Sequence, residues 1–201
     1  YEVNEAVNLY GRVAKGFRAP SIQGRLLFAS AAAPNGGVST ADSETVISYE
    51  AGIKADLFDR RARVGFNLFR YDVSDQQLIA VGGGANIATL LNADKTVGQG
   101  MEPDLEAWLA EGLLLTWGSS YNDTRIDDED LAVAVCGGGC TVTDPTVTIG
   151  GGTYALIDGN SLPQAPEWIH NLTLRYGIPL SEGELYFFTD WAYRSEVNFF
   201  L

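Results

Sequence analysis

The sequence is poor in the residues that build metal centres and nucleophilic active sites. Its 201 residues include only two cysteines, one histidine and one methionine. A four-ligand metal site is not expected, because Cys136, Cys140 and His170 are the only cysteines and histidine available. A serine hydrolase is not expected either, since His170 stands alone and no G-x-S-x-G motif is present. We therefore predict no catalytic residue, no metal site and no cofactor.

Positive charge and long apolar runs are also scarce. Lys and Arg number 13 against 26 Asp and Glu, and the net charge of −13 argues against nucleic acid as a partner. No window of about eighteen consecutive apolar residues exists, so no transmembrane helix is predicted. The Gly-rich stretches VGGGAN and CGGGC lack the Lys-Ser/Thr that follows a phosphate-binding loop, and flexible loop is the better interpretation.

Alternation of apolar and polar residues dominates the rest of the chain. In ETVISYEAGIKADLF (44–58), the odd positions from 47 to 57 are all apolar and the even positions from 48 to 56 are all polar or Gly. Period two indicates a strand with one apolar and one polar face. RARVGFNLFRYDVSD follows after a tight corner, and two more such pairs meet at Glu111-Gly112 and at Ser181-Glu182-Gly183. These pairs predict three β-hairpins.

Short and long connections alternate between the predicted strands. The long ones cover residues 18–43, 80–91 and 127–161, which are irregular and rich in Gly, Ala, Asp and Thr. Long irregular loops are unusual in compact soluble domains, but they alternate with tight turns in transmembrane β-barrels. We therefore predict an all-β fold, an antiparallel up-and-down transmembrane β-barrel fragment of about seven strands. The alternative on this pattern alone is a β-sandwich.

Aromatic residues and polar faces fit the barrel interpretation. Trp168 and Tyr176 share a face of one strand and lie roughly 20 Å apart along the membrane normal, close to the spacing of the two aromatic girdles of a barrel. His170 has the same phase, and we expect it on the outward face. The polar faces would line the lumen. The lumen-facing candidates are Arg12, Glu50, Lys54, Arg63, Asn67, Arg175, Asp190 and Arg194, together with Asn8, Glu102, Asp104, Glu106 and Asn171.

Several stretches resemble the barrel of TonB-dependent outer-membrane receptors. They are YGRVAKGFRAPSIQ, SYEAGIKADLFDRRARVGFNLFRYDVSDQQ, LPQAPEWIHNLTLRYGI and WAYRS, in that order and at suitable spacing. The segment TVGQGMEPDLEAWL departs from the family pattern, because Pro103 in a strand implies a bulge or a missing ladder bond. Within GFRAPS, Phe17 fits a membrane rim, and Pro20 ends the pairing and releases the chain into a long outer loop.

The resemblance implies a transporter of the bacterial outer membrane rather than an enzyme. Such a receptor has a twenty-two-stranded barrel with a plugged lumen. The expected ligand is a scarce nutrient, an iron chelate by family default, and the expected partners are the TonB energising complex and outer-membrane lipid. Residues 1–201 are then part of one barrel domain, and the chain is expected to be a middle-to-late slice of it, without the plug, the N-terminal segment that contacts TonB, and the terminal strand.

The long connections are where ligand contacts are expected, because loops carry function on a rigid scaffold. No individual substrate-binding residue within 18–43, 80–91 or 127–161 can be assigned from the sequence. Cys136 and Cys140 are candidates for a small disulfide loop. The acidic run NDTRIDDEDLA is better interpreted as a solvated loop than as a calcium site. A secreted or surface β-sandwich adhesin and a passive porin remain as alternative functions.

Overall fold

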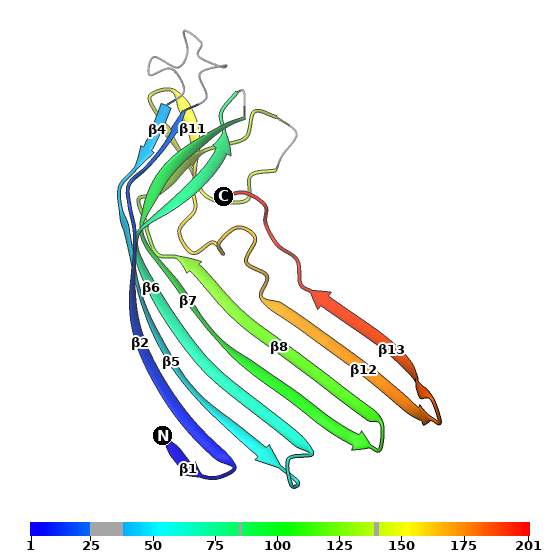
Figure 1. Cartoon of the computed structure of the whole chain (residues 1–201). Coiled ribbons are helices and arrows are strands. Elements are labelled where there is room, and N and C mark those ends of the chain that lie inside the picture. The colour runs from blue at the N-terminus through cyan, green and yellow to red at the C-terminus, as the bar shows by residue number, and fades with distance from the viewer. Residues whose placement is uncertain (25–37, 85, 139–140) are drawn as a thin grey trace.

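A computed structural model describes residues 1–24, 38–84, 86–138 and 141–201. Its main feature is one antiparallel sheet of eight strands in the order β1-β2-β5-β6-β7-β8-β12-β13, which curves along its length (Figure 1). β1 and β13 stand at its two edges, so the sheet is not closed. Within these residues, no helix is long and apolar enough to cross a membrane.

The seven predicted strands are confirmed, and β1 (Glu2–Asn4) adds a short eighth strand at the edge. The strands that had been expected are β2 (Val7–Arg18), β5 (Glu44–Leu57), β6 (Ala62–Gly82), β7 (Ile87–Ala110), β8 (Leu113–Ile126), β12 (Trp168–Leu180) and β13 (Gly183–Arg194). Tight turns join β5 to β6, β7 to β8 and β12 to β13, as predicted. Gly112 makes the second of these turns with a φ of 71°, a conformation that glycine adopts without strain.

The expectation that residues 80–91 form an irregular loop is wrong. β6 and β7 continue to pair beyond the predicted strand ends, from Gln76↔Ala93 to Gly82↔Ile87. The composition is Gly-rich only at the turn itself, where Gly83 has a φ of 74°. On either side the chain carries apolar and β-branched residues that sustain a ladder. The result is a long hairpin that projects past the neighbouring strands.

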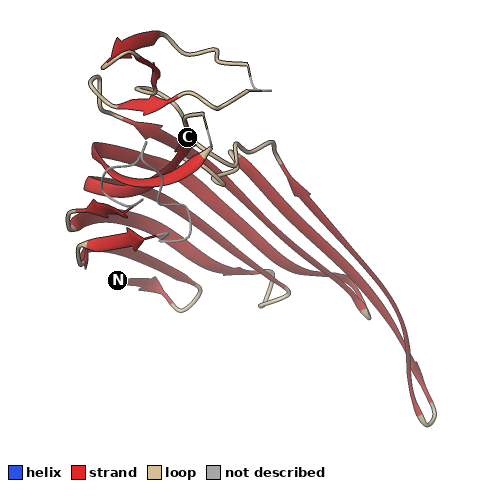
Figure 2. Ribbon diagram, turned by 90° about the horizontal axis from the view of Figure 1, so that it is seen from above, coloured by secondary structure: helices blue, strands red, loops and turns tan. Residues whose placement is uncertain are grey.

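The other two long connections contain short strands. Residues 18–43 hold a two-stranded sheet of β3 (Ser21–Gly24) and β4 (Val38–Ala41). Residues 127–161 hold a three-stranded sheet of β9 (Ala132–Ala134), β10 (Thr146–Ile149) and β11 (Gly152–Leu156). Both small sheets gather at the same end of the main sheet, where Figure 1 labels β4 and β11, and Figure 2 looks onto that end. These connections are therefore more ordered than their composition indicates.

The boundary predicted at GFRAPS is confirmed. β2 ends at Arg18, and β3 starts at Ser21 as part of a different sheet. Phe17 is 70% exposed, which fits a rim position. Pro103 interrupts the pairing of β7 with β8. The pairs Met101↔Tyr121 and Asp104↔Gly118 have the same register, but Glu102 and Pro103 between them have no partner on β8. The sequence predicted either a bulge or a missing ladder bond at Pro103, and the structure has the missing bond.

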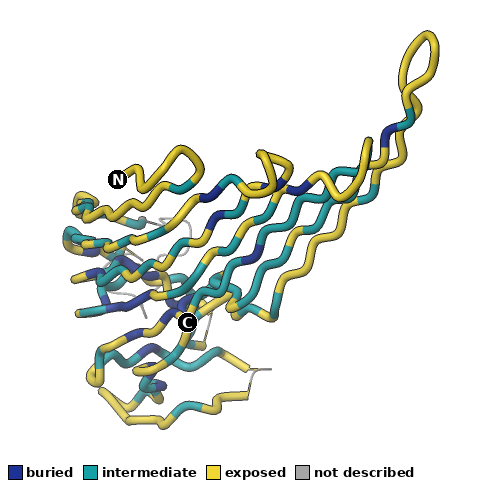
Figure 3. Tube along the Cα trace, turned by 90° about the horizontal axis from the view of Figure 1, so that it is seen from below, coloured by how far each residue is buried: buried dark blue, intermediate teal, exposed yellow. Residues whose placement is uncertain are grey.

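Buried hydrophobic residues concentrate at the end of the sheet that carries the long connections. One core cluster joins β6, β7 and β8 to the segment 131–162, and its members are Leu78, Ala80, Ala93, Ile126, Val133, Ala155, Ile157 and Leu162. The rest of the main sheet shows mostly intermediate and exposed residues (Figure 3). The chain thus divides into a wall, defined here as the part of the sheet between the tight turns and about residue 74 of β6, and an outer assembly beyond it.

Candidate functional site

The predicted lumen-facing residues share one face of the wall. The ladder places Arg12 opposite Glu50, and Asn67 opposite Gly52 on one side and Glu102 on the other. Directly opposed residues point to the same face of a sheet. The same reasoning carries this face across β8 to β12 and β13, where Asp190 lies opposite Thr173. Whether this polar face lines a lumen remains a prediction.

The polar face is organised as local pairs rather than as one cluster. Arg12 Nη1 lies 3.7 Å from Glu50 Oε1, and Arg63 Nε donates to Asp56 Oδ1 at 3.0 Å. Asn67 bridges two strands, because its amide donates to Glu102 Oε2 at 3.3 Å and accepts from the Tyr10 hydroxyl at 3.1 Å. Exposed pairs of this kind contribute little stability. Their role is therefore to keep charged groups solvated and paired along the wall.

The pairs on β12 and β13 lie apart from those on β2, β5 and β6. Arg175 Nη2 donates to Glu184 Oε2 at 2.6 Å, and Arg175 Cζ lies 5.0 Å from the centroid of the Tyr186 ring. Thr173 donates to Asp190 at 2.9 Å. Lys54 lies 5.8 Å from the Tyr10 ring centroid. The structure thus does not bring the eight predicted residues into a single site. It distributes them over the wall.

The opposite face of the wall exposes large apolar side chains. Val13, Leu68 and Trp191 are 71%, 51% and 53% exposed, although all three lie in well-paired strands. A soluble protein rarely leaves such a continuous apolar surface uncovered. Near the outer assembly four rings follow one another across β8, β12 and β13, namely Tyr121, Trp168, His170 and Tyr193. Such a row is typical of an aromatic girdle.

His170 belongs to this apolar face, as predicted. Its Nδ1 lies 2.7 Å from the Ser119 hydroxyl, so this ring nitrogen and the hydroxyl are hydrogen-bonded to each other. Higher on the same face, Arg70 bonds to Asp72 and Gln99, and Gln99 bonds to Asp123. This polar chain crosses three strands. It marks the edge of the apolar band, because Arg is costly in the hydrocarbon but tolerated near the interface.

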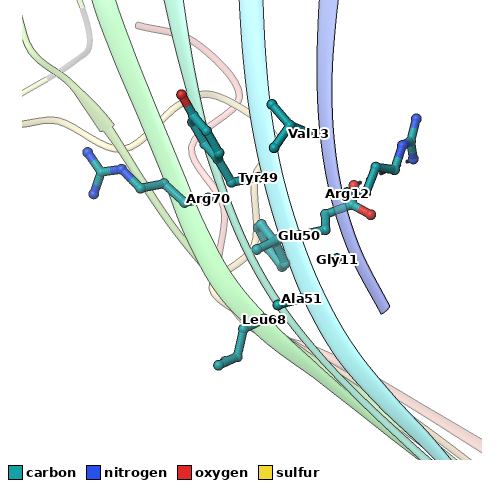
Figure 4. Close-up of a pocket in the computed structure, with 9 residues that line it drawn as sticks. Gly11, Arg12, Val13, Tyr49, Glu50, Ala51, Leu68 and Arg70 are labelled. Carbon is teal, nitrogen blue, oxygen red and sulfur yellow. Dashed lines mark ion pairs between the residues drawn. The ribbon is translucent and has the colours of Figure 1, made fainter. Parts of the chain in front are cut away.

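A shallow hollow of about 450 Å³ lies against β2, β5 and β6 (Figure 4). Gly11 and Ala51 are opposite each other in the ladder, and their small size leaves the space between the larger Val13, Tyr49 and Leu68. These five residues belong to the apolar face. Arg12, Glu50 and Arg70 also line it, but the ladder puts Arg12 and Glu50 on the polar face and only Arg70 on the apolar face. These charged groups therefore do not converge on one point of the hollow.

The outer assembly contains a second cavity of about 510 Å³ that is more enclosed and mixed in character. It lies between the β6–β7 hairpin, which contributes Val81 and Asn86, and the segment around β9 and β11. Its apolar lining is Val81, Val133, Val135, Val142, Ala155, Ile157, Phe200 and Leu201. Thr141, Thr143 and Asp144 add polar atoms at its margin. A mostly apolar cavity with a few polar groups is the usual form of a small-molecule site.

Two of the three predicted ligand-contact segments meet at this cavity, namely 80–91 and 127–161. The third, 18–43, lies on the hairpin through β3 and β4, and its residues 25–37 are outside the described part of the chain. Cys140 is also outside the described residues, so the Cys136–Cys140 disulfide stays a prediction. Among the described residues no group of acidic, Cys or His side chains could hold a metal ion.

The comparison with known proteins agrees with this geometry. The family model for the TonB dependent receptor-like β-barrel matches residues 1–200. The chain belongs to this family. Members are proteins of the bacterial outer membrane, where barrels have an apolar outward face and their longer loops on the extracellular side.

Solved receptors have the same fold. The ferric yersiniabactin uptake receptor FyuA of Yersinia pestis is 19% identical, with a TM-score of 0.61 over 92% of this chain and 23% of FyuA. The ferric preacinetobactin receptor BauA of Acinetobacter baumannii is 14% identical, with a TM-score of 0.59 over 96% of this chain and 24% of BauA. The siderophore receptor PirA of Pseudomonas aeruginosa is 16% identical, with a TM-score of 0.52 over 95% of this chain and 32% of PirA.

At these identities the likeness is one of fold. The chain spans about a quarter of the length of FyuA and BauA. It corresponds to a segment of their barrel, and the matched proteins are receptors rather than enzymes. The prediction of family, fold and outer-membrane location from the sequence is therefore confirmed.

Proposed function

We propose that the chain is part of an outer-membrane receptor that binds a scarce nutrient at the cell surface and imports it into the periplasm with energy supplied through TonB. The observation that carries the proposal is the family match over residues 1–200 on a wall with one apolar and one polar face. Residues 1–201 would be one part of a single barrel domain. The contact with TonB would be made by an N-terminal part of the receptor that is not in this chain.

An iron chelate is the proposed nutrient. FyuA is a receptor for ferric yersiniabactin and BauA for ferric preacinetobactin, which supports iron chelates as the ligand class without naming the chelate. The cavity of the outer assembly supports the same proposal, because its apolar walls and polar margin suit an organic chelator. The paired charges of the polar face would contact water and the plug domain of the receptor rather than the nutrient.

Uptake of iron in the producing strain tests this proposal. Deletion of the gene for the full-length receptor should abolish uptake of iron-55 presented in the strain's own siderophore-containing culture fluid, and a plasmid copy should restore it. Deletion of tonB should abolish uptake to the same extent while leaving receptor abundance unchanged. Uptake that survives either deletion would contradict the proposal.

The alternative of a β-sandwich adhesin is not supported by the fold. A sandwich needs a second sheet packed over the apolar face of the first. In the described ranges the small sheets lie at one end and the apolar face of the wall stays exposed. A passive porin is not supported either, because the family match is to energised receptors.

A further inference from the structure

The β6–β7 hairpin connects the two other long connections of the outer assembly. Adjacent pairs in its ladder are Gln77↔Asn92 and Leu78↔Leu91, and adjacent pairs point to opposite faces. One face of the hairpin therefore presents two amide side chains, and the other presents Leu78 to the buried core. The sequence does not identify either amide, because Gln77 and Asn92 lie just outside the segment 80–91 that was expected to be a loop.

Gln77 holds both ends of the connection 18–43. Its amide Nε2 donates to Ala19 O at 2.8 Å and to Asp42 O at 2.9 Å, and its Oε1 accepts from the Ser21 hydroxyl at 2.5 Å. Its backbone N–H donates to Glu44 Oε2 at 2.7 Å. Gln77 itself is only 6% exposed, whereas its partners Ala19 and Asp42 lie at the surface. All donors and acceptors of the side-chain amide are thus used on this one connection.

Asn92 completes the attachment from the partner strand. Its Oδ1 accepts from Asp42 N–H at 2.7 Å, and its Nδ2 donates to Asp42 O at 3.2 Å and to Asp75 O at 2.6 Å. Leu90 N–H donates to the Ser39 hydroxyl at 2.9 Å. β4 is therefore held to β7 by polar contacts. Both amides converge on the backbone of Asp42, where the chain returns to the wall.

The same hairpin is attached to the connection 127–161 by different means. Leu78, Ala80 and Ala93 pack in the core with residues of the segment 131–162. At the tip, Gly83 N–H donates to Val135 O at 2.8 Å, and Asn86 Oδ1 accepts from Gly137 N–H at 2.7 Å. Val81 and Asn86 also line the cavity of the outer assembly. The hairpin that carries Gln77 and Asn92 therefore also forms one side of that cavity.

We propose that Gln77 and Asn92 are positioning residues for ligand capture, because they attach the connection 18–43 to the hairpin that forms the cavity wall. The proposal rests on the proposed function. Loss of the Gln77 side chain would remove the bonds to Ala19 O and to the Ser21 hydroxyl, and one of the two amide bonds to Asp42 O. Loss of the Asn92 side chain would remove the bonds to Asp42 N–H and Asp75 O and the other amide bond to Asp42 O. Either substitution removes several bonds of the attachment together, which is more costly than the loss of a single exposed bond. The connection would then detach from the hairpin, while the wall would keep its ladder.

Hydrogen–deuterium exchange of the full-length receptor in detergent tests the attachment. Gln77→Ala should accelerate exchange of amides in β3 and β4 by at least about tenfold, with amides of β5 and β12 unchanged. Gln77→Glu keeps the size and the acceptor but removes both donors, and it should have a similar effect. Gln99→Ala is the matched control, because Gln99 lies on β7 and bonds to Arg70 and Asp123 instead. Unchanged exchange in β3 and β4 would overturn the proposal.

Iron uptake tests the consequence for capture. With iron-55-charged culture fluid as the probe, Gln77→Ala and Asn92→Ala should each raise the half-saturating concentration about tenfold and leave the maximal rate and receptor abundance unchanged. Gln99→Ala should behave as wild type. Faster exchange without a change in half-saturation would overturn the positioning role alone. Absence of uptake by the wild-type receptor would instead overturn the proposed function, so the two failures are distinguishable.

Discussion

The wall and the outer assembly are built from the same strands but are stabilised differently. β6 illustrates this, because it runs through both. In the wall, Leu68 of β6 is 51% exposed, and strand pairing rather than a buried core holds this part of the strand. Ten residues further along the strand, Leu78 is 8% exposed and belongs to a conventional core. The same strand therefore passes from a region with an exposed apolar face to one with a buried protein core.

Substitutions are therefore expected to have different effects in the two regions. In the wall the alternation of faces determines which residues can be replaced, since lipid accepts any apolar shape and the polar face accepts charge. In the outer assembly shape matters, because side chains such as Ile126 and Ile157 fill closed space and are almost completely buried. Hydrogen bonds such as those of Gln77 also require a defined position of donor and acceptor there.

The largest expected difference in the free energy of unfolding is between two leucine-to-alanine substitutions on β6. Leu78→Ala should lower the free energy of unfolding by about 2–5 kcal/mol, because it leaves a cavity in the core of the outer assembly. Leu68→Ala should cost less than about 1 kcal/mol, because lipid fills the space that the side chain leaves. Guanidine unfolding of the full-length receptor in lipid vesicles measures both. Equal losses would show that the two regions are not stabilised differently.

A charge placed on either face of the wall gives the next largest contrast. Phe66→Arg puts a guanidinium on the lipid-facing side near the middle of the wall and should cost about 2–4 kcal/mol. Asn67→Arg, one residue further, points to the polar face beside Glu102 and should be tolerated. The yield of folded receptor in the outer membrane and its unfolding in vesicles report the effect. Similar tolerance of both substitutions would contradict the assignment of faces.

The hydrogen bond between Ser119 and His170 should have a moderate effect. It lies on the lipid-facing side of the wall, where water cannot replace either partner well. Ser119→Ala should therefore destabilise the receptor by about 0.5–1.5 kcal/mol. Ser120→Ala, on the polar face of the same strand, is the control. A loss for Ser120→Ala as large as that for Ser119→Ala would argue against a dry environment at His170.

The smallest effect is expected for the polar chain at the edge of the apolar band. Arg70 is about half exposed and pairs with Asp72 at 3.3 Å. Arg70→Ala should cost less than about 1 kcal/mol, and the difference should shrink as salt is raised. Unfolding measured at two salt concentrations checks this. A large, salt-independent loss would mean that Arg70 lies deeper in the membrane than the polar chain indicates.

The wall could be predicted from the sequence because its physics is local. Period two in the segment 44–58 defines a strand and its faces, and Pro20 defines where β2 stops. The outer assembly could not be predicted in the same way. The Gly-rich stretch around Gly83 looked like loop, yet Leu78 and Ala93 extend the ladder because segments distant in sequence cover them.

The attachment by Gln77 and Asn92 shows the same limit for the functional region. Both are ordinary polar residues in a short alternating run, and their common partner Asp42 lies 35 and 50 residues away. The spacing of residues within a short stretch of sequence does not predict contacts over such distances along the chain. The lumen-facing candidates, in contrast, share one face of the sheet, which follows from the alternation and the register of neighbouring strands alone. That this face lines a lumen stays a prediction.

The most direct test of the account is a scan of β6 from Val64 to Phe69 by spin labels on single introduced cysteines in the full-length receptor in lipid vesicles. The account predicts that collision with oxygen dissolved in the bilayer is high at positions 64, 66 and 68 and low at 65, 67 and 69. Such a period of two would establish that one face of the strand contacts lipid. Equal accessibility along the strand, or maxima at the odd positions, would contradict the claim that this chain is a segment of an outer-membrane barrel wall with the faces assigned here.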